Sequence, residues 1–266
     1  MTNNFFIGYN PQLPKELYKF VRRIILWLFA LFLLAGILIA FHHREISTSS
    51  FEFGQLTTVE GVYFATPVPL IKVLNGKDYY GNPVFKTIPL VNYAKFGAEE
   101  LMQEVEKEYP SPFHGKKLQV MGTLLYDDGK ILLELTKQKE SILSMETITE
   151  EEALLYQPHI EDLGTQSLLG EIVDSKCYFG AMRPGFGKPH RSCAVRCISG
   201  GIPPVLAATN YMGETNYFLI RGHRKQAINK KVLPFVAEPV RLTGRLVRFD
   251  DWMVIYVDPQ TGIARQ

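Results

Sequence analysis

The residues best suited to chemistry in this sequence are three cysteines and one histidine that fall in a single stretch. Cys177 is followed by His190, Cys193 and Cys197, with the spacing C-x12-H-x2-C-x3-C. Thiolate sulfur and imidazole nitrogen are preferred ligands of zinc and copper, and four of them fill a tetrahedral shell. The spacing matches no standard zinc-finger, c-type haem or thioredoxin motif, so it predicts a metal or thiol site without fixing which.

Local structure must bring these four side chains together. If residues 191–199 form a helix, Cys193 and Cys197 lie one turn apart on one face, and His190 joins that face from the preceding turn. Cys177 closes a predicted strand and approaches from its end. The glycines and prolines of residues 200–204 are expected to end the helix.

Three neighbouring side chains are auxiliary candidates. Met182 offers a thioether, which together with two thiolates and His190 would suit copper. Arg191 and Arg196 are expected to lower the thiol pKa values and so favour metal ligation or nucleophilic attack.

Other uses of the cysteines remain open at this point. In an oxidising compartment, Cys177 could bond to Cys193 or Cys197 and staple the loop to its domain, leaving one free thiol. The thiols could instead be redox-active. A cysteine nucleophile with His190 as base is the third alternative, but no residue that would orient the histidine stands out in the sequence. No catalytic residue is therefore predicted.

The segment KCYFGAMRPGFGKPHRSCAVRCISGGIPP, residues 176–204, resembles one found in uncharacterised bacterial single-pass membrane proteins with an OB-like domain. The shared features are a Lys-Cys pair, a Gly-Lys-x-His-Arg run, two further cysteines and a GGIPP tail. No activity is established for that family. The resemblance implies only that Cys177, His190, Cys193 and Cys197 act together.

Two segments of the chain predict related β domains. Residues 117–135 and 240–257 each read as two apolar strands around an aspartate-bearing turn, with Gly122 corresponding to Gly244 and Asp127-Asp128 to Asp250-Asp251 after one inserted residue. Strand-like runs at 57–64 and 169–177 and short helical stretches at 98–108 and 226–235 precede them. This order is typical of a small Greek-key barrel of the OB type. The alternative is two unrelated hairpins, because such turns are common.

The predicted fold class is therefore mainly β, with an N-terminal transmembrane helix followed by two OB-like small β-barrels. The expected boundaries are a cytoplasmic tail at 1–19, the membrane helix at 20–43, barrels at 50–143 and 165–266, and a linker helix at 144–164. Thr149 can cap that linker helix, with Glu152 at the position that completes a capping box.

The membrane anchor is predicted from residues 24–41, which carry no charge and include Ile24, Trp27 and Phe41. At about 1.5 Å per residue, a helix over this run nearly crosses a hydrocarbon core of about 30 Å. His42, His43 and Arg44 can reach back to the far interface. A cleaved signal peptide is the alternative, although a small-x-small cleavage site is lacking.

Charge asymmetry predicts the orientation. Lys15, Lys19, Arg22 and Arg23 precede the apolar run, whereas Arg44 is balanced by Glu45 after it. The positive-inside rule places the N-terminus in the cytoplasm of a bacterial cell and residues 45–266 outside the inner membrane. The expected partners are the lipid bilayer and another membrane or periplasmic protein. The formal net charge of +2 argues against a nucleic-acid binder.

Other polar clusters have simpler explanations. The tyrosine-rich segment GKDYYGNP, residues 76–83, is expected to be a turn. The aspartate pairs 127–128 and 250–251 are assigned to turn geometry alone. His114 and His159 are isolated. No nucleophile elbow, P-loop, dinucleotide fingerprint or HExxH motif occurs in the sequence.

Overall fold

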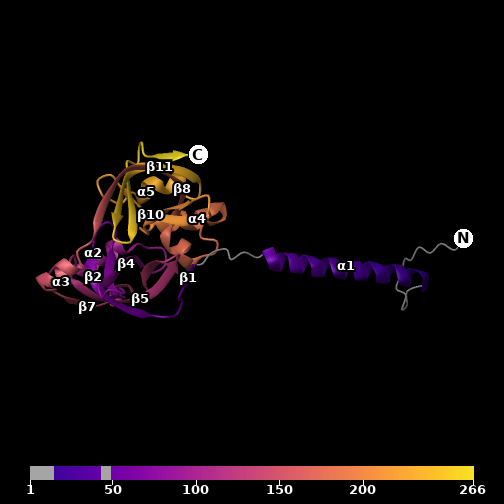
Figure 1. Cartoon of the computed structure of the whole chain (residues 1–266), viewed down its shortest axis with the longest axis horizontal. Helices are drawn as coiled ribbons and strands as arrows, with labels where there is room; N and C mark the ends of the chain where they lie inside the picture. Colours follow the sequence, from indigo (N-terminus) through magenta and orange to yellow (C-terminus); the bar gives the residue numbers. More distant parts are fainter. Residues whose placement is uncertain (1–14, 43–48) are drawn as a thin grey trace. The chain divides into compact units, whose positions relative to one another are not determined.

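The computed structural model describes residues 15–42 and 49–266, which belong to two compact units (Figure 1). Within its described residues, the first unit is a single helix. The second, within residues 47–266, contains every strand of the described chain. The first unit is thus the anchor candidate, and the second carries the candidate chemistry.

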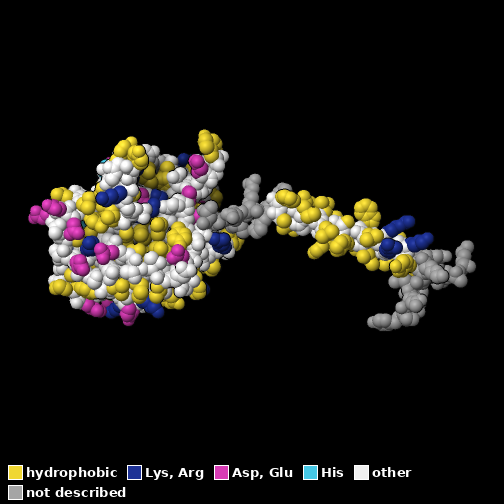
Figure 2. All heavy atoms as spheres, turned by 60° about the horizontal axis from the view of Figure 1, so that its bottom comes forward, with side chains coloured by type: hydrophobic (Ala, Val, Ile, Leu, Met, Phe, Trp, Pro, Cys, Tyr) yellow, Lys and Arg dark blue, Asp and Glu magenta, His cyan; other side chains and the backbone are white. Residues whose placement is uncertain are grey.

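Helix α1 spans Lys15–His42 and is long and apolar enough to cross a membrane, with a mean hydropathy of 3.0 over Leu17–Phe41. The side chains of Ile24, Trp27 and Phe41 are all exposed. Figure 2 shows hydrophobic side chains along this helix, with lysine and arginine gathered towards its N-terminal end. The helix begins inside the segment predicted as a tail.

The first barrel closes from five strands: β2 (Thr57–Phe64), β3 (Leu70–Lys77), β4 (Pro83–Asn92), β6 (Lys130–Leu135) and β5 (Lys117–Asp127), in that spatial order and back to β2. Only the β4–β6 pair is parallel. Helix α2 (Ala98–Glu106) lies between the third and fourth strands in sequence. Short strands β1 (Ser50–Phe51) and β7 (Ile142–Glu146) add to β5, and a 3-10 turn, η1 (Gln138–Ser141), precedes β7.

The second barrel repeats this topology. Its ring runs through β8 (Ile160–Asp174), β9 (Pro204–Thr209), β10 (Thr215–Gly222), β12 (Trp252–Val257) and β11 (Pro239–Phe249), with β10–β12 as the parallel pair. A short helical segment, α5 (Asn229–Val232) with η3 (Leu233–Phe235), again lies between the third and fourth strands, and β13 (Ile263–Arg265) adds to β11. The predicted pair of small barrels is confirmed.

The predicted linker helix is much shorter than expected. Helix α3 covers only Glu150–Leu155, and β8 already begins at Ile160, inside the predicted linker. The Thr149 side chain accepts from the N–H of Glu152, whose carboxylate accepts from the N–H of Thr149. The predicted capping box is therefore confirmed.

Equivalent glycines let both barrels close. A Cβ on Gly122 would collide with the Glu134 carbonyl, and one on Gly244 with the Tyr256 carbonyl. Each glycine sits on the fourth strand of its barrel, facing the fifth. Gly61 and Gly170, on the two first strands, are equally crowded by the second strands. Glycine is required here because neighbouring backbones approach closely.

The aspartate turns align differently from the sequence prediction. Asp128 and Asp250 are the residues with left-handed φ angles, 46° and 50°, and each directly follows the fourth strand of its barrel. Asp128 is six residues after Gly122, and Asp250 is six after Gly244, so no inserted residue is needed. The prediction matched the wrong member of the first pair.

Reciprocal contacts pack the two barrels together. The hairpin after the fourth strand of one barrel meets the second and third strands of the other: Tyr217 donates to Asp127 over 2.8 Å, and Trp252 Nε1 donates to the Thr87 carbonyl over 2.9 Å. The buried Lys72 ammonium lies 2.9 Å from Asp250. A shared core lies beneath these contacts, including Leu70, Leu125, Leu219, Phe249 and Trp252. Turn geometry alone therefore does not explain the aspartates, because they also join the barrels.

Candidate metal and thiol site

The cysteine–histidine segment fills the gap between the first two strands of the second barrel. Residues 175–203 hold a single π-helical turn, η2 (Cys177–Ala181), and helix α4 (Gly187–Ser199). Gly200 ends α4 as predicted. His190 and Cys197 are buried on one face of α4, and Cys193 lies half-buried between them. The predicted helix, and the common face it creates, are confirmed.

The other three candidate residues converge on Cys177. Its sulfur, an imidazole nitrogen of His190 and the sulfur of Cys193 all lie within 4.8 Å of one another. A second group with the same spread joins Cys177, Cys197 and an oxygen of Asp174. All three cysteines are free thiols. The structure thus brings together the four residues that the sequence proposed, in two overlapping sets that share Cys177.

Asp174 is a site residue that the sequence analysis missed. Its fully buried carboxylate accepts from the backbone N–H of Cys177 over 2.9 Å and lies 3.4 Å from His190 Nε2. A carboxylate on one ring nitrogen orients an imidazole and leaves the other nitrogen for a metal or a thiol proton. The available signal was an aspartate three residues before a cysteine, at the end of a strand.

Lys95 is the second missed residue, and it comes from the first barrel. Its ammonium donates to Cys193 Sγ over 3.0 Å, and this bond is the largest cause of the raised pKa of Lys95. The loop that carries Lys95 follows β4 and lies far from the cysteines in sequence. No motif connects the two segments, so only the packing of the barrels reveals this contact.

The two buried thiols differ in acidity. The hydrogen bond between Cys177 and Cys197, followed by burial and the nearby Asp174, raises the pKa of Cys177. The same hydrogen bond is the largest cause of the lowered pKa of Cys197, and the positive charge of Lys95 adds to it. Cys177 therefore holds its proton more tightly than Cys197 does, because the two pKa values shift in opposite directions.

The three predicted auxiliary residues do not direct their side chains at the thiols. Arg191 lies 2.5 Å from Glu238 and also donates to the Pro234 carbonyl. The side chains of Arg196 and Met182 are exposed, although the Met182 N–H donates to the Cys177 carbonyl over 3.3 Å. The cation next to the thiols is Lys95 rather than either arginine.

The first barrel helps to enclose the site. Val91 packs with Cys177, Cys197 and Ile202 in one buried cluster. Next to Cys177, the buried Lys176 ammonium lies 2.5 Å from the buried Glu134 carboxylate of β6 and also bonds to the Asn92 and Ala94 carbonyls. The thiols therefore lie at the junction of the barrels, and not within the second barrel alone.

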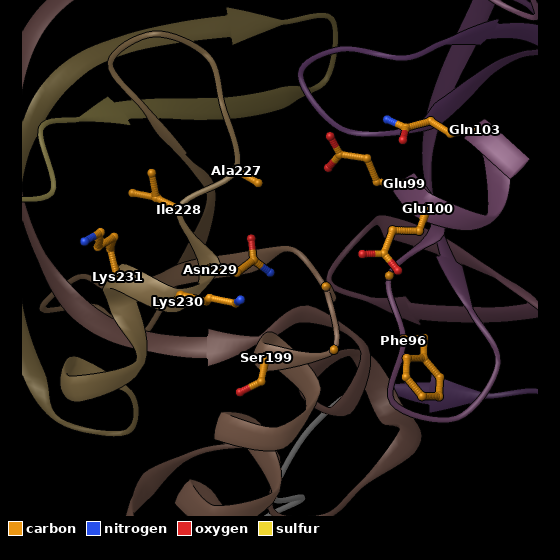
Figure 3. A pocket seen from close by; sticks show the side chains of 13 residues that line it. Phe96, Glu99, Glu100, Gln103, Ser199, Ala227, Ile228, Asn229, Lys230 and Lys231 are labelled. Atoms are coloured by element: carbon orange, nitrogen blue, oxygen red, sulfur yellow. The ribbon is translucent and has the colours of Figure 1, made fainter.

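A pocket of about 620 Å³ opens at the same junction, and one of its sides is the C-terminal end of α4. Figure 3 shows Glu99 and Glu100 on one wall and Lys230 and Lys231 on the other. The Gly97 N–H donates to the Gly200 carbonyl across the barrel junction. Neither the cysteines nor His190 line this pocket, so it is distinct from the cysteine cluster.

No protein-family model matches this chain, and no curated protein sequence matches it. The chemistry of the site must therefore be judged from its geometry. Three thiols, one carboxylate-oriented imidazole and one neighbouring ammonium can hold a soft metal ion, exchange disulfides or activate a thiol.

Proposed function

We propose that this protein is a membrane-anchored, extracytoplasmic accessory protein that binds one copper or zinc ion. Cys177, His190 and Cys193 supply ligands, and Cys197 lies next to Cys177 as a further thiolate. The observation that carries the proposal is the convergence of these side chains on Cys177, with all three thiols free.

The burial of the thiols favours a bound metal ion over thiolates that have no neighbouring cation. Cys177, Cys197, His190 and Asp174 are all buried, so their polar atoms have little access to water. A cation there offsets the cost of burying thiolates, which are soft ligands for copper(I) and zinc. Asp174 fixes the imidazole in the manner of a carboxylate behind a metal-bound histidine.

The location follows from the anchor. Lys19, Arg22 and Arg23 lie at the N-terminal end of α1, which supports a cytoplasmic N-terminus under the positive-inside rule. Residues 45–266 would then face the periplasm, where the expected partner is another membrane or periplasmic protein that donates or receives the ion.

A non-enzymatic scaffold that binds a partner protein or a polymer is a weaker alternative for this pair of barrels. OB barrels bind oligonucleotides and oligosaccharides on the face of their second and third strands. Here those strands of the two barrels face each other across the shared core that contains Leu70 and Leu219. A scaffold would have to bind its partner through another surface, and the cysteines would serve only to form a disulfide that ties the loop to its barrel.

A thiol nucleophile is the second candidate function, and Asp174 is the observation that favours it. The carboxylate, His190 and a cysteine form the acid–base–nucleophile order of thiol enzymes. Cys193 is the partly exposed member of the set and the one that a substrate could reach.

Metal analysis of the full chain tests the proposal. Protein purified in detergent under reducing, chelator-free conditions should hold about one copper or zinc ion per chain. His190→Ala should lose the ion, whereas His159→Ala should keep it, because His159 is exposed and bonds to Asp250 only through its backbone. An ion-free chain with one fixed disulfide and one free thiol would instead support the scaffold. An ion-free chain with three reactive thiols would support the function as a thiol nucleophile.

A further inference from the structure

The hairpins between the second and third strands of the two barrels end in the same short motif. Residues 78–82 read Asp-Tyr-Tyr-Gly-Asn between β3 and β4, and residues 210–214 read Asn-Tyr-Met-Gly-Glu between β9 and β10. Both therefore have the pattern Asx-Tyr-apolar-Gly-polar at equivalent positions. We call these two segments the hairpin tips.

The backbone of the two hairpin tips is fixed in the same way. Asp78 Oδ1 accepts from the N–H groups of residues 80 and 82, both over 2.8 Å. Asn210 Oδ1 accepts from the N–H groups of residues 212 and 214, over 2.9 and 3.0 Å. Gly81 and Gly213 supply left-handed φ angles of 84° and 87°. The Asx and Gly residues therefore make the turn, and the two side chains between them are free to serve another purpose.

Those two side chains are large, uncharged and mostly exposed at both hairpin tips. Tyr79 and Tyr80 are 96% and 85% exposed, and Tyr211 and Met212 are 92% and 66% exposed. Single exposed apolar residues need no explanation, but a pair repeated at equivalent hairpins does. A surface that takes up apolar groups at both positions would explain the repetition.

We propose that both hairpin tips enter the interfacial region of the lipid bilayer. This inference rests on the anchoring part of the proposed function, because α1 puts every copy of the chain in contact with a membrane and only residues 43–48 separate it from the folded unit. Tyrosine favours that region because its ring is apolar and its hydroxyl is polar. None of the four exposed side chains carries a charge that would resist transfer.

Both tips belong to equivalent hairpins of two barrels that pack directly on each other. Tyr217 of the second barrel contacts Asp127 of the first, and Trp252 contacts Thr87. The proposal therefore assigns both tips to the same lipid surface.

Fluorescence quenching in lipid nanodiscs tests this inference with the full chain. In a Trp27→Phe background, the remaining Trp252 is fully buried between the barrels. Tyr79→Trp or Tyr211→Trp then adds one tryptophan at a tip, and Tyr93→Trp, at a site 49% exposed, is the control. Phosphatidylcholine brominated near the headgroup should reduce the added emission of each tip variant roughly twofold, in keeping with insertion of about 5–10 Å. The control should not change.

An absence of quenching at both hairpin tips would overturn the inference, and quenching at one tip alone would overturn the joint contact. The native chain separates this failure from failure of the anchor. If Trp27 is quenched by bromines deep in the acyl region, the anchor is sound and only the role of the tips is wrong. Metal content should be equal in all these variants, since neither tip contacts the thiols.

Discussion

The two barrels share strand order, closing glycines and hairpin tips, yet only one carries the chemistry. Between its first and second strands the first barrel has residues 65–69, whereas the second has residues 175–203, with η2, α4 and all three cysteines. The same fold therefore tolerates either a short connection or a whole site at that position. The site lies in an insertion whose helix α4 also packs Ala194 and Ile198 into the core of the second barrel.

The first barrel still takes part, because it covers the insertion of the second. Lys95 reaches Cys193, Val91 packs on the buried thiols, and Glu134 pairs with Lys176. One barrel thus supplies the candidate ligands, and the other supplies charge and enclosure. Substitutions in each barrel can separate these two contributions.

The largest effect is expected for Cys177→Ser, since this thiol belongs to both ligand sets. Metal affinity should fall more than about 100-fold, beyond the usual cost of losing a group that only supports a ligand. Cys197→Ser should cost less, about tenfold, because the set with His190 and Cys193 stays complete. Competition with a chromophoric chelator measures both. Equal losses would mean that the two sets act as one site.

Lys176→Met should strongly destabilise the junction of the barrels. It leaves the Glu134 carboxylate buried without its cation, which costs about 3–5 kcal/mol. Urea unfolding in the Trp27→Phe background, followed by the emission of Trp252, would measure the change. Arg245→Met is the matched control, because it removes an exposed partner of Asp162, and it should shift the transition little. Similar midpoints for the two variants would contradict the account of the junction.

Gly122→Ala and Gly244→Ala should damage the two barrels to a similar extent. Each Cβ would collide with a backbone carbonyl of the adjacent fifth strand, and such overpacking costs about 1–3 kcal/mol. The same unfolding assay applies. A large loss for one variant and none for the other would show that the barrels do not close in the same way.

The smallest effect is expected for Lys95→Met, which removes a charge from the first barrel. The hydrogen bond from Cys177 would still hold the pKa of Cys197 low, but the contribution of the lysine charge would be lost. The pKa of Cys197 should rise, so its alkylation in metal-free protein should need a higher pH. Mass spectrometry of iodoacetamide-treated protein across a pH series reports this shift. An unchanged or reversed pH profile of alkylation would show that Lys95 does not influence the Cys197 thiol.

Local patterns predicted much of this molecule from sequence. The length of the apolar run predicts α1. The matching hairpins around Gly122 and Gly244 predict the paired barrels, and the Cys193–Cys197 spacing predicts the shared face of α4. Each of these depends on residues close together in the chain.

The missed features depend on packing between distant segments. Lys95 and Cys193 meet only because the barrels associate, and the Asp250–Lys72 pair has the same origin. The assignment of the aspartates to turns alone was wrong for this reason. The repeated hairpin tips cannot be predicted from sequence, because Asp-Tyr-Tyr and Asn-Tyr-Met share a backbone role more than they share residue types.

X-ray absorption at the metal edge of the full chain tests the central claim most directly. The account predicts two or three sulfur ligands at about 2.3 Å and one nitrogen ligand at about 2.0–2.1 Å if the ion is zinc. The nitrogen contribution should vanish in His190→Ala. A shell of oxygen ligands alone, or a spectrum unaffected by both Cys177→Ser and His190→Ala, would contradict it.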